Sequence, residues 1–335
     1  MAKTKNIKDT DYLFSSARIK YLEQKLLSRD KLERMSNAKS PEEALKLLSE
    51  FGWPEISKPT MAAVEEALAS RRNEAFALVR NMAPEKRLTD IFFIKYDYHN
   101  LKTLLKSEAT GENPDSLLIE SGMFPCRHLK IMLQEDKYPG MNKNMIGSIA
   151  EARDVLARTQ DPQLLDMIFD KAMYTDMLGI VNSLKFNFLK NYVVLLIDSV
   201  NLRTYVRSRR MGKGYEMLRY ALVQGGTVSV SRLLEDVSTD VIESVFYYSP
   251  LAVAAQAGAQ ALRGEKSLYN MDLTCDNVLL KYLKTAKYIA FGAEPLIGYL
   301  AAVEAELTSI RTVIAGRIAG LSAETIIERL RETYV

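Results

Sequence analysis

One fifteen-residue segment occurs three times in this chain, each time with the same ungapped spacing. The copies read DYHNLKTLLKSEATG, DSVNLRTYVRSRRMG and ELTSIRTVIAGRIAG. The aligned positions are Asp97, Asp198 and Glu306 for the acid, Asn100, Asn201 and Ser309 for a small polar residue, Lys102, Arg203 and Arg311 for a cation, and Gly111, Gly212 and Gly320 for a closing glycine. Agreement at this many positions indicates a threefold internal duplication of a unit of roughly 100 residues.

The pattern of apolar residues predicts an all-α protein. Proline and glycine are few for a chain of 335 residues, with 10 and 16 respectively, and strong helix formers are abundant. Apolar residues recur at spacings of three and four almost throughout the chain, as at Leu22, Leu26 and Leu27. Sustained alternation of apolar and polar residues, which would indicate strands, is nearly absent.

The acid and the small polar residue of each copy interrupt an apolar helical stripe. In the first copy Ile94 and Leu101 fall on the same helical face as Asp97 and Asn100. A buried carboxylate costs several kcal/mol unless it is hydrogen-bonded or paired. We therefore expect each acid to meet a helix N-terminus, a tyrosine or an arginine from elsewhere in its own repeat. The cation five residues later points away from the acid, so the two do not form a local salt bridge.

The closing glycine predicts the end of a long helix, because glycine readily adopts the left-handed conformation of a helix C-terminus. Each motif helix should contain about 25 residues, or roughly 38 Å at 1.5 Å per residue. A short helix is expected after each glycine, with Ser322 as the N-cap in the third copy. We place the domain boundaries near 122 and 226, which gives repeats at residues 1–122, 123–226 and 227–335.

Charge and cysteine content exclude several classes of protein. The 45 basic and 42 acidic residues nearly balance, so the chain has no field for gathering nucleic acid. Two cysteines do not support a disulfide framework and fit a reducing compartment. The N-terminal residues have no apolar signal-peptide core, and proline and glutamines interrupt the longest apolar run. We therefore expect a soluble, cytoplasmic protein.

The residue types needed for catalysis or for metal binding do not converge in the sequence. No GxxxxGK[ST] phosphate loop is present, and the glycine-flanked Lys213 follows a helix rather than a strand. Cys126 and His128 are two residues apart, a spacing that does not let them face each other on a helix. His99 has no histidine at the aligned position of the other copies. We predict no catalytic residue, no cofactor and no metal.

The acid itself could in principle be a tuned acid or base. Its recurrence in all three copies favours a structural role, because a catalytic group is normally needed once. An enzyme that depends on Asp97 or Asp198 stays open as an alternative.

Basic residues cluster at the end of the second motif helix and near the end of the third. The sequence there makes a partner contact possible at Arg207, Arg209, Arg210, Lys213 and Arg317. A solvated helix end, where cations complement the helix dipole, is the simpler interpretation. An acidic protein partner is the alternative. The repeat alone therefore indicates a helical scaffold, and a scaffold for other protein partners remains a candidate function.

The three DxxNL[KR]T-like segments and the C-terminal block from FGAEPLIGYL to RETYV resemble one known family. The chain is similar over essentially its whole length to the C subunit of the bacterial and archaeal V-type (A-type) ATPases, the counterpart of the d subunit of the eukaryotic V-ATPase. The third copy departs from the pattern at two positions, with Glu306 in place of aspartate and Ser309 in place of asparagine.

The resemblance implies a rotor part without chemistry of its own. It implies three similar helical domains arranged as a funnel around a pseudo-threefold axis. The wide end would sit on the membrane proteolipid ring, and the cavity would receive the tip of the central stalk, made of the D and F subunits. The chain would then be a peripheral protein on the inner face of the cell membrane. It would couple ATP hydrolysis or synthesis to the transport of protons or sodium ions.

Overall fold

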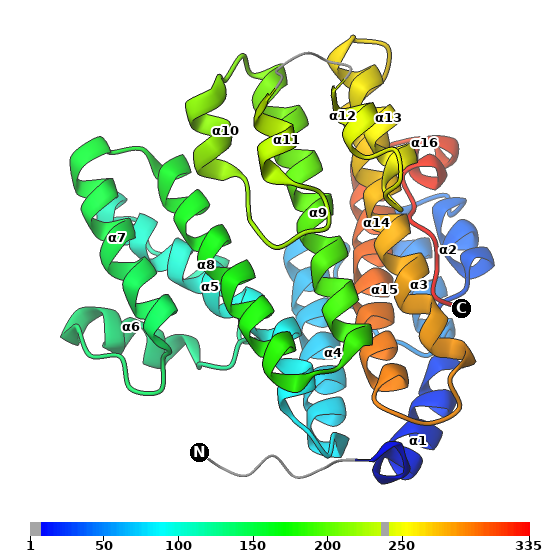
Figure 1. Ribbon diagram of the computed structural model, residues 1–335. Coiled ribbons are helices and arrows are strands. Elements are labelled where there is room, and N and C mark those ends of the chain that lie inside the picture. The colour runs from blue at the N-terminus through cyan, green and yellow to red at the C-terminus, as the bar shows by residue number, and fades with distance from the viewer. Residues whose placement is uncertain (1–7, 236–240) are drawn as a thin grey trace. The chain divides into compact units, whose positions relative to one another are not determined.

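The computed structural model describes residues 8–235 and 241–335, and every regular element in that part of the chain is a helix (Figure 1). The predicted all-helical fold class is therefore confirmed. The elements are η1 (Asp9–Tyr12), α1 (Leu13–Glu23), α2 (Arg29–Ser36), α3 (Pro41–Glu50), α4 (Met61–Met82), α5 (Arg87–Thr110), η2 (Asp115–Leu117), α6 (Cys126–Glu135), α7 (Lys143–Thr159), α8 (Pro162–Leu184), α9 (Asn187–Arg210), α10 (Tyr215–Ala221), α11 (Val230–Glu235), α12 (Val241–Val245), α13 (Ala252–Leu262), α14 (Leu268–Lys284), η3 (Thr285–Tyr288), α15 (Glu294–Ile318) and α16 (Ala323–Glu328). Within the described ranges, none of these helices combines the length and the apolar character that crossing a membrane requires.

The chain divides into two compact units. One, which we call the terminal unit, contains residues 1–89 and 276–335, and the other, the central unit, contains residues 90–275. The central unit holds most of α5 and all of α9, and the terminal unit holds α15. The division into three repeats with boundaries near 122 and 226 remains a prediction.

The three motif helices have the predicted length. They contain 24 residues in α5, 24 in α9 and 25 in α15. Their apolar stripes are buried as expected: Leu202 and Tyr205 on α9 and Ile310 on α15 are each 0% exposed. Because the stripe also carries the acid and the small polar residue, burying it removes these polar groups from water.

Each motif helix ends at its predicted glycine. Gly111, Gly212 and Gly320 have φ angles of 73°, 68° and 71°, the left-handed conformation. After α9, the N–H of Gly212 donates to the carbonyl of Arg209, and the N–H of Lys213 donates to that of Ser208, at 3.0 and 2.9 Å. These bonds satisfy carbonyl groups that the end of the helix leaves without partners.

The short helices expected after the glycines occur in two copies. They are α10 and α16, and the Ser322 hydroxyl caps α16 by accepting a hydrogen bond from the N–H of Thr325 at 3.2 Å. In the first copy, Asn113 and Pro114 follow the glycine closely, and only the 3₁₀ turn η2 forms. Proline restricts the residue before it to extended conformations, which opposes a longer helix there.

We expect Gly212→Ala to lower the free energy of unfolding by about 1 kcal/mol, because a β-carbon disfavours the left-handed conformation. The midpoint of urea unfolding measures this change. Gly147→Ala is the matched control, because Gly147 lies inside α7 and a β-carbon there contacts nothing within 4 Å. That change should stabilise by about 0.5–1 kcal/mol. Equal effects of the two substitutions would contradict the assignment of Gly212 as a conformational requirement.

Candidate functional site

The acid of each motif accepts hydrogen bonds from the backbone of a loop that leads into another helix. Asp97 of α5 accepts from the N–H groups of Met123 and Phe124, both at 3.0 Å. Helix α6 then begins at Cys126. The loop supplies the hydrogen bonds that a carboxylate at 0% exposure requires.

The second and third acids repeat this arrangement. Asp198 of α9 accepts from the N–H groups of Thr227 and Val228 at 3.1 and 3.0 Å and from the Thr227 hydroxyl at 2.5 Å. Glu306 of α15 accepts from the N–H of Leu27 at 2.7 Å. Phe124, Val228 and Leu27 each lie two residues before the first residue of a helix, which is α6, α11 or α2. We call these three contacts the loop anchors.

The loop anchors correct one expectation from the sequence. The loops do lie next to helix N-termini, which is one of the three expected kinds of partner. The expectation that each partner comes from the acid's own repeat is wrong. With boundaries near 122 and 226, the loops that bind Asp97 and Asp198 lie just beyond the boundary, and Leu27 belongs to the first repeat rather than the third.

Glycine makes room for the carboxylate in the first two loop anchors. A β-carbon on Gly122 would lie 2.2 Å from Oδ1 of Asp97, and one on Gly226 would lie 2.0 Å from Oδ1 of Asp198. The corresponding residue of the third loop, two positions before Leu27, is Lys25. There the acid is the longer glutamate. The shorter acid therefore occurs with glycine in the loop, and the longer acid occurs with a residue that has a β-carbon.

The small polar residue ties the same loop to the helix in the first two copies. The Asn100 amide donates to the carbonyl of Ile119 at 2.8 Å and accepts from its N–H at 2.9 Å. The Asn201 amide does the same with Val223, at 2.7 and 2.8 Å. Ser309 instead donates to the carbonyl of Ala305 in its own helix at 2.9 Å. The third copy therefore lacks the paired amide contact.

Glu306 is less fully hydrogen-bonded than the other two acids. Its side chain is buried, and Oε2 makes no hydrogen bond to any described residue. Burial raises the pKa of this carboxyl to about 7, against the opposing effects of the Leu27 N–H and the charges of Arg71 and Lys31. At neutral pH a large fraction of Glu306 is therefore protonated.

The cation of each motif pairs with an acid on a different helix. Lys102 pairs with Asp170 of α8, and Arg311 binds both carboxylate oxygens of Glu65 of α4 at 2.5 and 2.6 Å. Arg203 donates to the backbone carbonyl of Asp272 of α14 at 3.1 Å and lies 3.5 Å from its carboxylate. Each of these partners lies on another helix than the acid of the cation's own segment.

The partners of the cations follow the order of the repeats. Lys102 of the first copy reaches α8, the long helix that precedes the motif helix of the second copy. In the same way, Arg203 of the second copy reaches α14, which precedes the motif helix of the third copy, and Arg311 of the third copy reaches α4, which precedes that of the first. Arg311 joins the third copy back to the first. We call these contacts the cation bridges. Their side chains are roughly one fifth to two fifths exposed, so each bridge contributes about 0.2–1 kcal/mol.

At least two of the five predicted partner-contact residues have partners within the chain. The Arg207 guanidinium donates to both carboxylate oxygens of Asp272 at 2.8 Å. Arg317 donates to the carbonyl of Ala38, between α2 and α3, at 2.8 Å. Arg209 is half-buried. The structure places the other two, Arg210 and Lys213, with exposed side chains at the end of α9.

The apolar side chains beside these cations were missed by the sequence reasoning. Met211 and Tyr215 are 59% and 47% exposed, and they flank the turn that contains Gly212 and Lys213. In the sequence, Met211 and Tyr215 lie in the glycine-containing turn after α9, and only their exposure in the structure distinguishes them from core residues. The side chains of Arg210, Met211, Lys213 and Tyr215 form what we call the basic turn.

The residues considered for catalysis do not assemble. Cys126 is buried and His128 is exposed, so the two do not face each other. Burial raises the pKa of the Cys126 thiol to about 12, which keeps it protonated and unreactive. Within residues 8–235 and 241–335, no group of three or more His, Cys, Asp and Glu side chains is placed to hold a metal ion.

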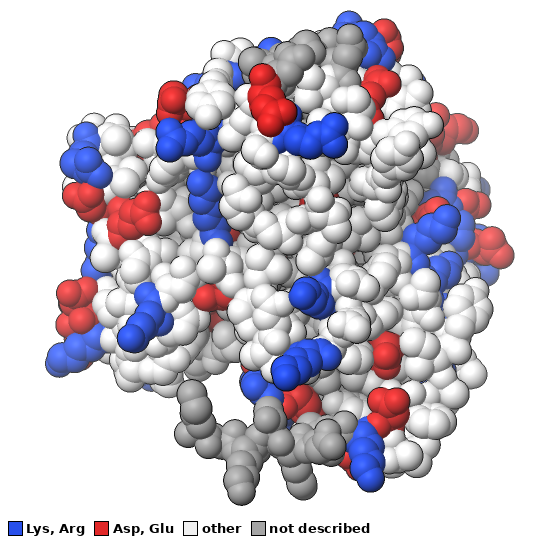
Figure 2. All heavy atoms as spheres, viewed as in Figure 1, with Lys and Arg blue, Asp and Glu red and all other residues white. Residues whose placement is uncertain are grey.

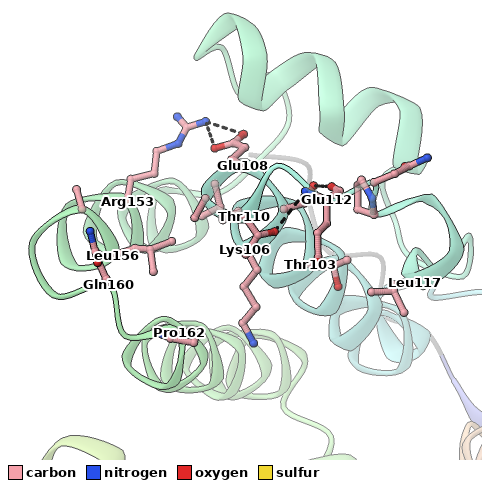
Figure 3. A pocket seen from close by; sticks show the side chains of 16 residues that line it. Thr103, Lys106, Glu108, Thr110, Glu112, Leu117, Arg153, Leu156, Gln160 and Pro162 are labelled. Carbon is pink, nitrogen blue, oxygen red and sulfur yellow. Dashed lines mark hydrogen bonds and ion pairs between the residues drawn. The ribbon is translucent and has the colours of Figure 1, made fainter.

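A cavity of about 990 Å³ lies in the central unit, beside the last turns of α5 and the segment that follows it (Figure 3). Its lining combines apolar side chains, such as Leu117 and Leu156, with charged ones that already have partners. Arg153 of α7 reaches Glu108 of α5 at 3.3 Å, as Figure 3 shows, and Lys106 pairs with Asp166 at 2.7 Å. Among the described residues, no histidine or cysteine lines the cavity, and its lining provides no nucleophile with an adjacent base.

Surface charge does not point to a nucleic acid partner. On the face shown in Figure 2, lysine and arginine side chains are interspersed with aspartate and glutamate among the described residues. Interspersed charges produce no extended positive potential. The arrangement can therefore anchor loops to helices and present a local basic turn.

Comparison with known proteins identifies related chains. The sequence model of the family described as "ATP synthase (C/AC39) subunit" matches residues 15–329. The C subunit of the V-type sodium ATPase of Enterococcus hirae is 25% identical over 319 residues, which cover 93% of this chain and 95% of that protein. The C subunit of the A-type ATP synthase of Methanocaldococcus jannaschii is 25% identical over 341 residues, which cover 94% of this chain and 85% of that protein. That of Haloferax volcanii is 26% identical over 278 residues, with 78% and 79% covered.

Gly226→Ala should destabilise the protein by about 1–3 kcal/mol, because the new β-carbon would lie 2.0 Å from the Asp198 carboxylate and 2.9 Å from its Cγ. Urea unfolding measures the change. In an Asp198→Ala background the same substitution should cost much less, because the colliding group is then absent.

Gly214→Ala is the matched control for this loop anchor. A β-carbon on Gly214 contacts nothing within 4 Å, and its φ of −88° suits alanine. We expect an effect within about 0.5 kcal/mol. A Gly226→Ala variant as stable as Gly214→Ala would show that the glycine is not required by the carboxylate.

Proposed function

Because the chain belongs to the ATP synthase (C/AC39) subunit family, we propose that it is a non-catalytic rotor subunit of a rotary V-type or A-type ATPase. In this role it links the central shaft, formed by the D and F subunits, to the membrane proteolipid ring. It transmits torque between ATP hydrolysis or synthesis and the transport of H⁺ or Na⁺. The family match over residues 15–329 is the observation that carries this proposal.

Stiffness within each unit supports a mechanical role. A rotor part must resist bending under load, and close-packed helices with satisfied buried polar groups do so. Asp97 and Asp198 meet this requirement through two and three hydrogen bonds from their loops. These bonds fix the direction in which the chain enters α6 and α11. A force applied to α6 or α11 is then transmitted directly to a motif helix, which is α5 or α9.

A rotor part also needs surfaces that grip its neighbours. The basic turn combines two exposed cations, Arg210 and Lys213, with the exposed apolar side chains of Met211 and Tyr215. Arginine, methionine and tyrosine are enriched at protein interfaces. We assign the basic turn to the contact with an acidic surface of one rotor neighbour. Attachment to the ring would hold the protein on the inner face of the cell membrane.

Purification of the tagged full-length chain from its host membranes in mild detergent tests the proposed function. We expect the D and F subunits and the proteolipid ring to copurify with it, as identified by mass spectrometry. Recovery of a monomer, or of unrelated soluble partners only, would show that the chain is a scaffold for other proteins instead.

Reversing charge in the basic turn should weaken this assembly. We expect Arg210→Glu with Lys213→Glu to reduce recovery of one neighbour at least tenfold at low salt, with a smaller effect at high salt because salt screens exposed charges. Lys137→Glu with Lys143→Glu is the matched control. Both lysines are exposed, and the pair makes the same change in net charge elsewhere in the central unit. Equal losses from the two pairs would mean that net charge, and not the basic turn, governs assembly.

A further inference from the structure

The C-terminal residues 329–335 follow α16 without regular secondary structure and pack against the terminal unit, and we call this segment the C-terminal strap. Side chains of α14 hold the strap. Asp276 accepts from the Arg331 guanidinium at 2.8 Å, and Lys284 donates to the carbonyl of Thr333 at 2.9 Å. Tyr334, which is 3% exposed, donates its hydroxyl to Glu23 of α1 at 3.1 Å.

The strap covers the one loop anchor that is incomplete. A cavity of about 10 Å³ lies between them, lined by Glu306 and Ser309 of α15, by Leu26 and Leu27, and by Glu332, Thr333 and Tyr334 of the strap. This volume is near the minimum for one water molecule, so the strap leaves almost no space around the carboxyl. The Oε2 atom of Glu306 has no hydrogen-bond partner among the described residues, although the side chain is only 6% exposed.

We propose that Glu306 is a proton-operated latch for the C-terminal strap: the protonated carboxyl lets the strap close over it, and loss of the proton opens the strap. A neutral carboxyl needs only the hydrogen bond that Leu27 already provides. An ionised carboxylate in the same place would leave a charged oxygen buried without a partner. Opening the strap gives that oxygen access to water, and the proton is released to solvent.

The groups around Glu306 do not remove this cost. Those that face it from the packed elements are Lys31 of α2, Arg71 of α4, Tyr299 of α15 itself, Glu332 and Tyr334 of the strap, and Glu23 of α1 through Tyr334. Lys31 and Arg71 favour the ionised form, but burial outweighs them and leaves the pKa raised to about 7.

The sign of the pH dependence follows from this raised pKa. The closed form binds the proton more tightly than an open form, in which the carboxyl has its ordinary value of 4.5. Closure is therefore most stable below pH 4.5. It weakens as the pH rises toward 7 and stays at its weakened level above that. Between pH 6 and pH 8 the opening equilibrium should increase about tenfold, because each pKa unit corresponds to a factor of ten.

Hydrogen exchange of the full chain, followed by mass spectrometry on C-terminal peptides, tests the latch. After correction for the intrinsic pH dependence of exchange, strap amides should lose about tenfold protection between pH 6 and pH 8. In Glu306→Gln, which keeps the shape but cannot ionise, protection should stay constant. An unchanged wild-type profile, or the same tenfold loss in Glu306→Gln, would overturn the proposal.

Asp198→Asn is the matched control, since that acid has three hydrogen bonds and no strap above it. It should leave the pH dependence of the strap as in the wild type. Carbon-13 NMR of the glutamate carboxyls in the wild-type chain provides a second measurement that needs no variant. One buried glutamate should titrate between pH 6 and 8, and the absence of any such resonance would also refute the latch.

Discussion

A carboxylate placed on an apolar helical face is the constraint on which the rest of this structure depends. Once the stripe of a motif helix is buried, the carboxylate must find donors that water no longer supplies, and leaving it without them costs about 3–5 kcal/mol. Backbone N–H groups of a nearby loop satisfy Asp97 and Asp198. A loop held in this way has a fixed direction, so the helix that follows it also has a fixed starting point. One buried carboxylate thus specifies how the motif helix, the loop that binds it and the helix after that loop are arranged.

The third copy satisfies its acid from a distant part of the sequence. The donor is Leu27, on the loop between α1 and α2, rather than a loop that follows the motif helix. That loop has Lys25 where the other loops have glycine, and the acid is a glutamate with one further methylene group. Contact between residues so distant in sequence helps to bring residues 1–89 and 276–335 into one compact unit.

The ends, the cap and the buried faces of the helices were predictable from the sequence, because residues close together in the chain determine them. The glycine at the end of α9 and the Ser322 cap of α16 depend on backbone conformation within a few residues. The buried face of each motif helix follows from the helical period. The donors to the acids were not predictable in the same way, because a backbone N–H has no side-chain signature and lies 26 to 30 residues away, or 279 for Glu306. Gly122 and Gly226 were visible, but the sequence suggested only that they mark boundaries. The exposure of Met211 and the partner of Arg207 required coordinates.

The strengths of the buried and the exposed contacts bear on the proposed rotor role. The cation bridges join successive copies but lie where water reaches them, and each exposed ion pair contributes about 0.2–1 kcal/mol. The loop anchors are buried, and removing the partners of a buried charge costs several times more, about 3–5 kcal/mol. The stronger contacts are therefore the loop anchors, and with the boundaries near 122 and 226 each of them also joins an acid to a loop of another copy. The cation bridges add weaker contacts that select which helix packs against which. The weakest of the anchors, at Glu306, is also the one that joins the first copy to the third.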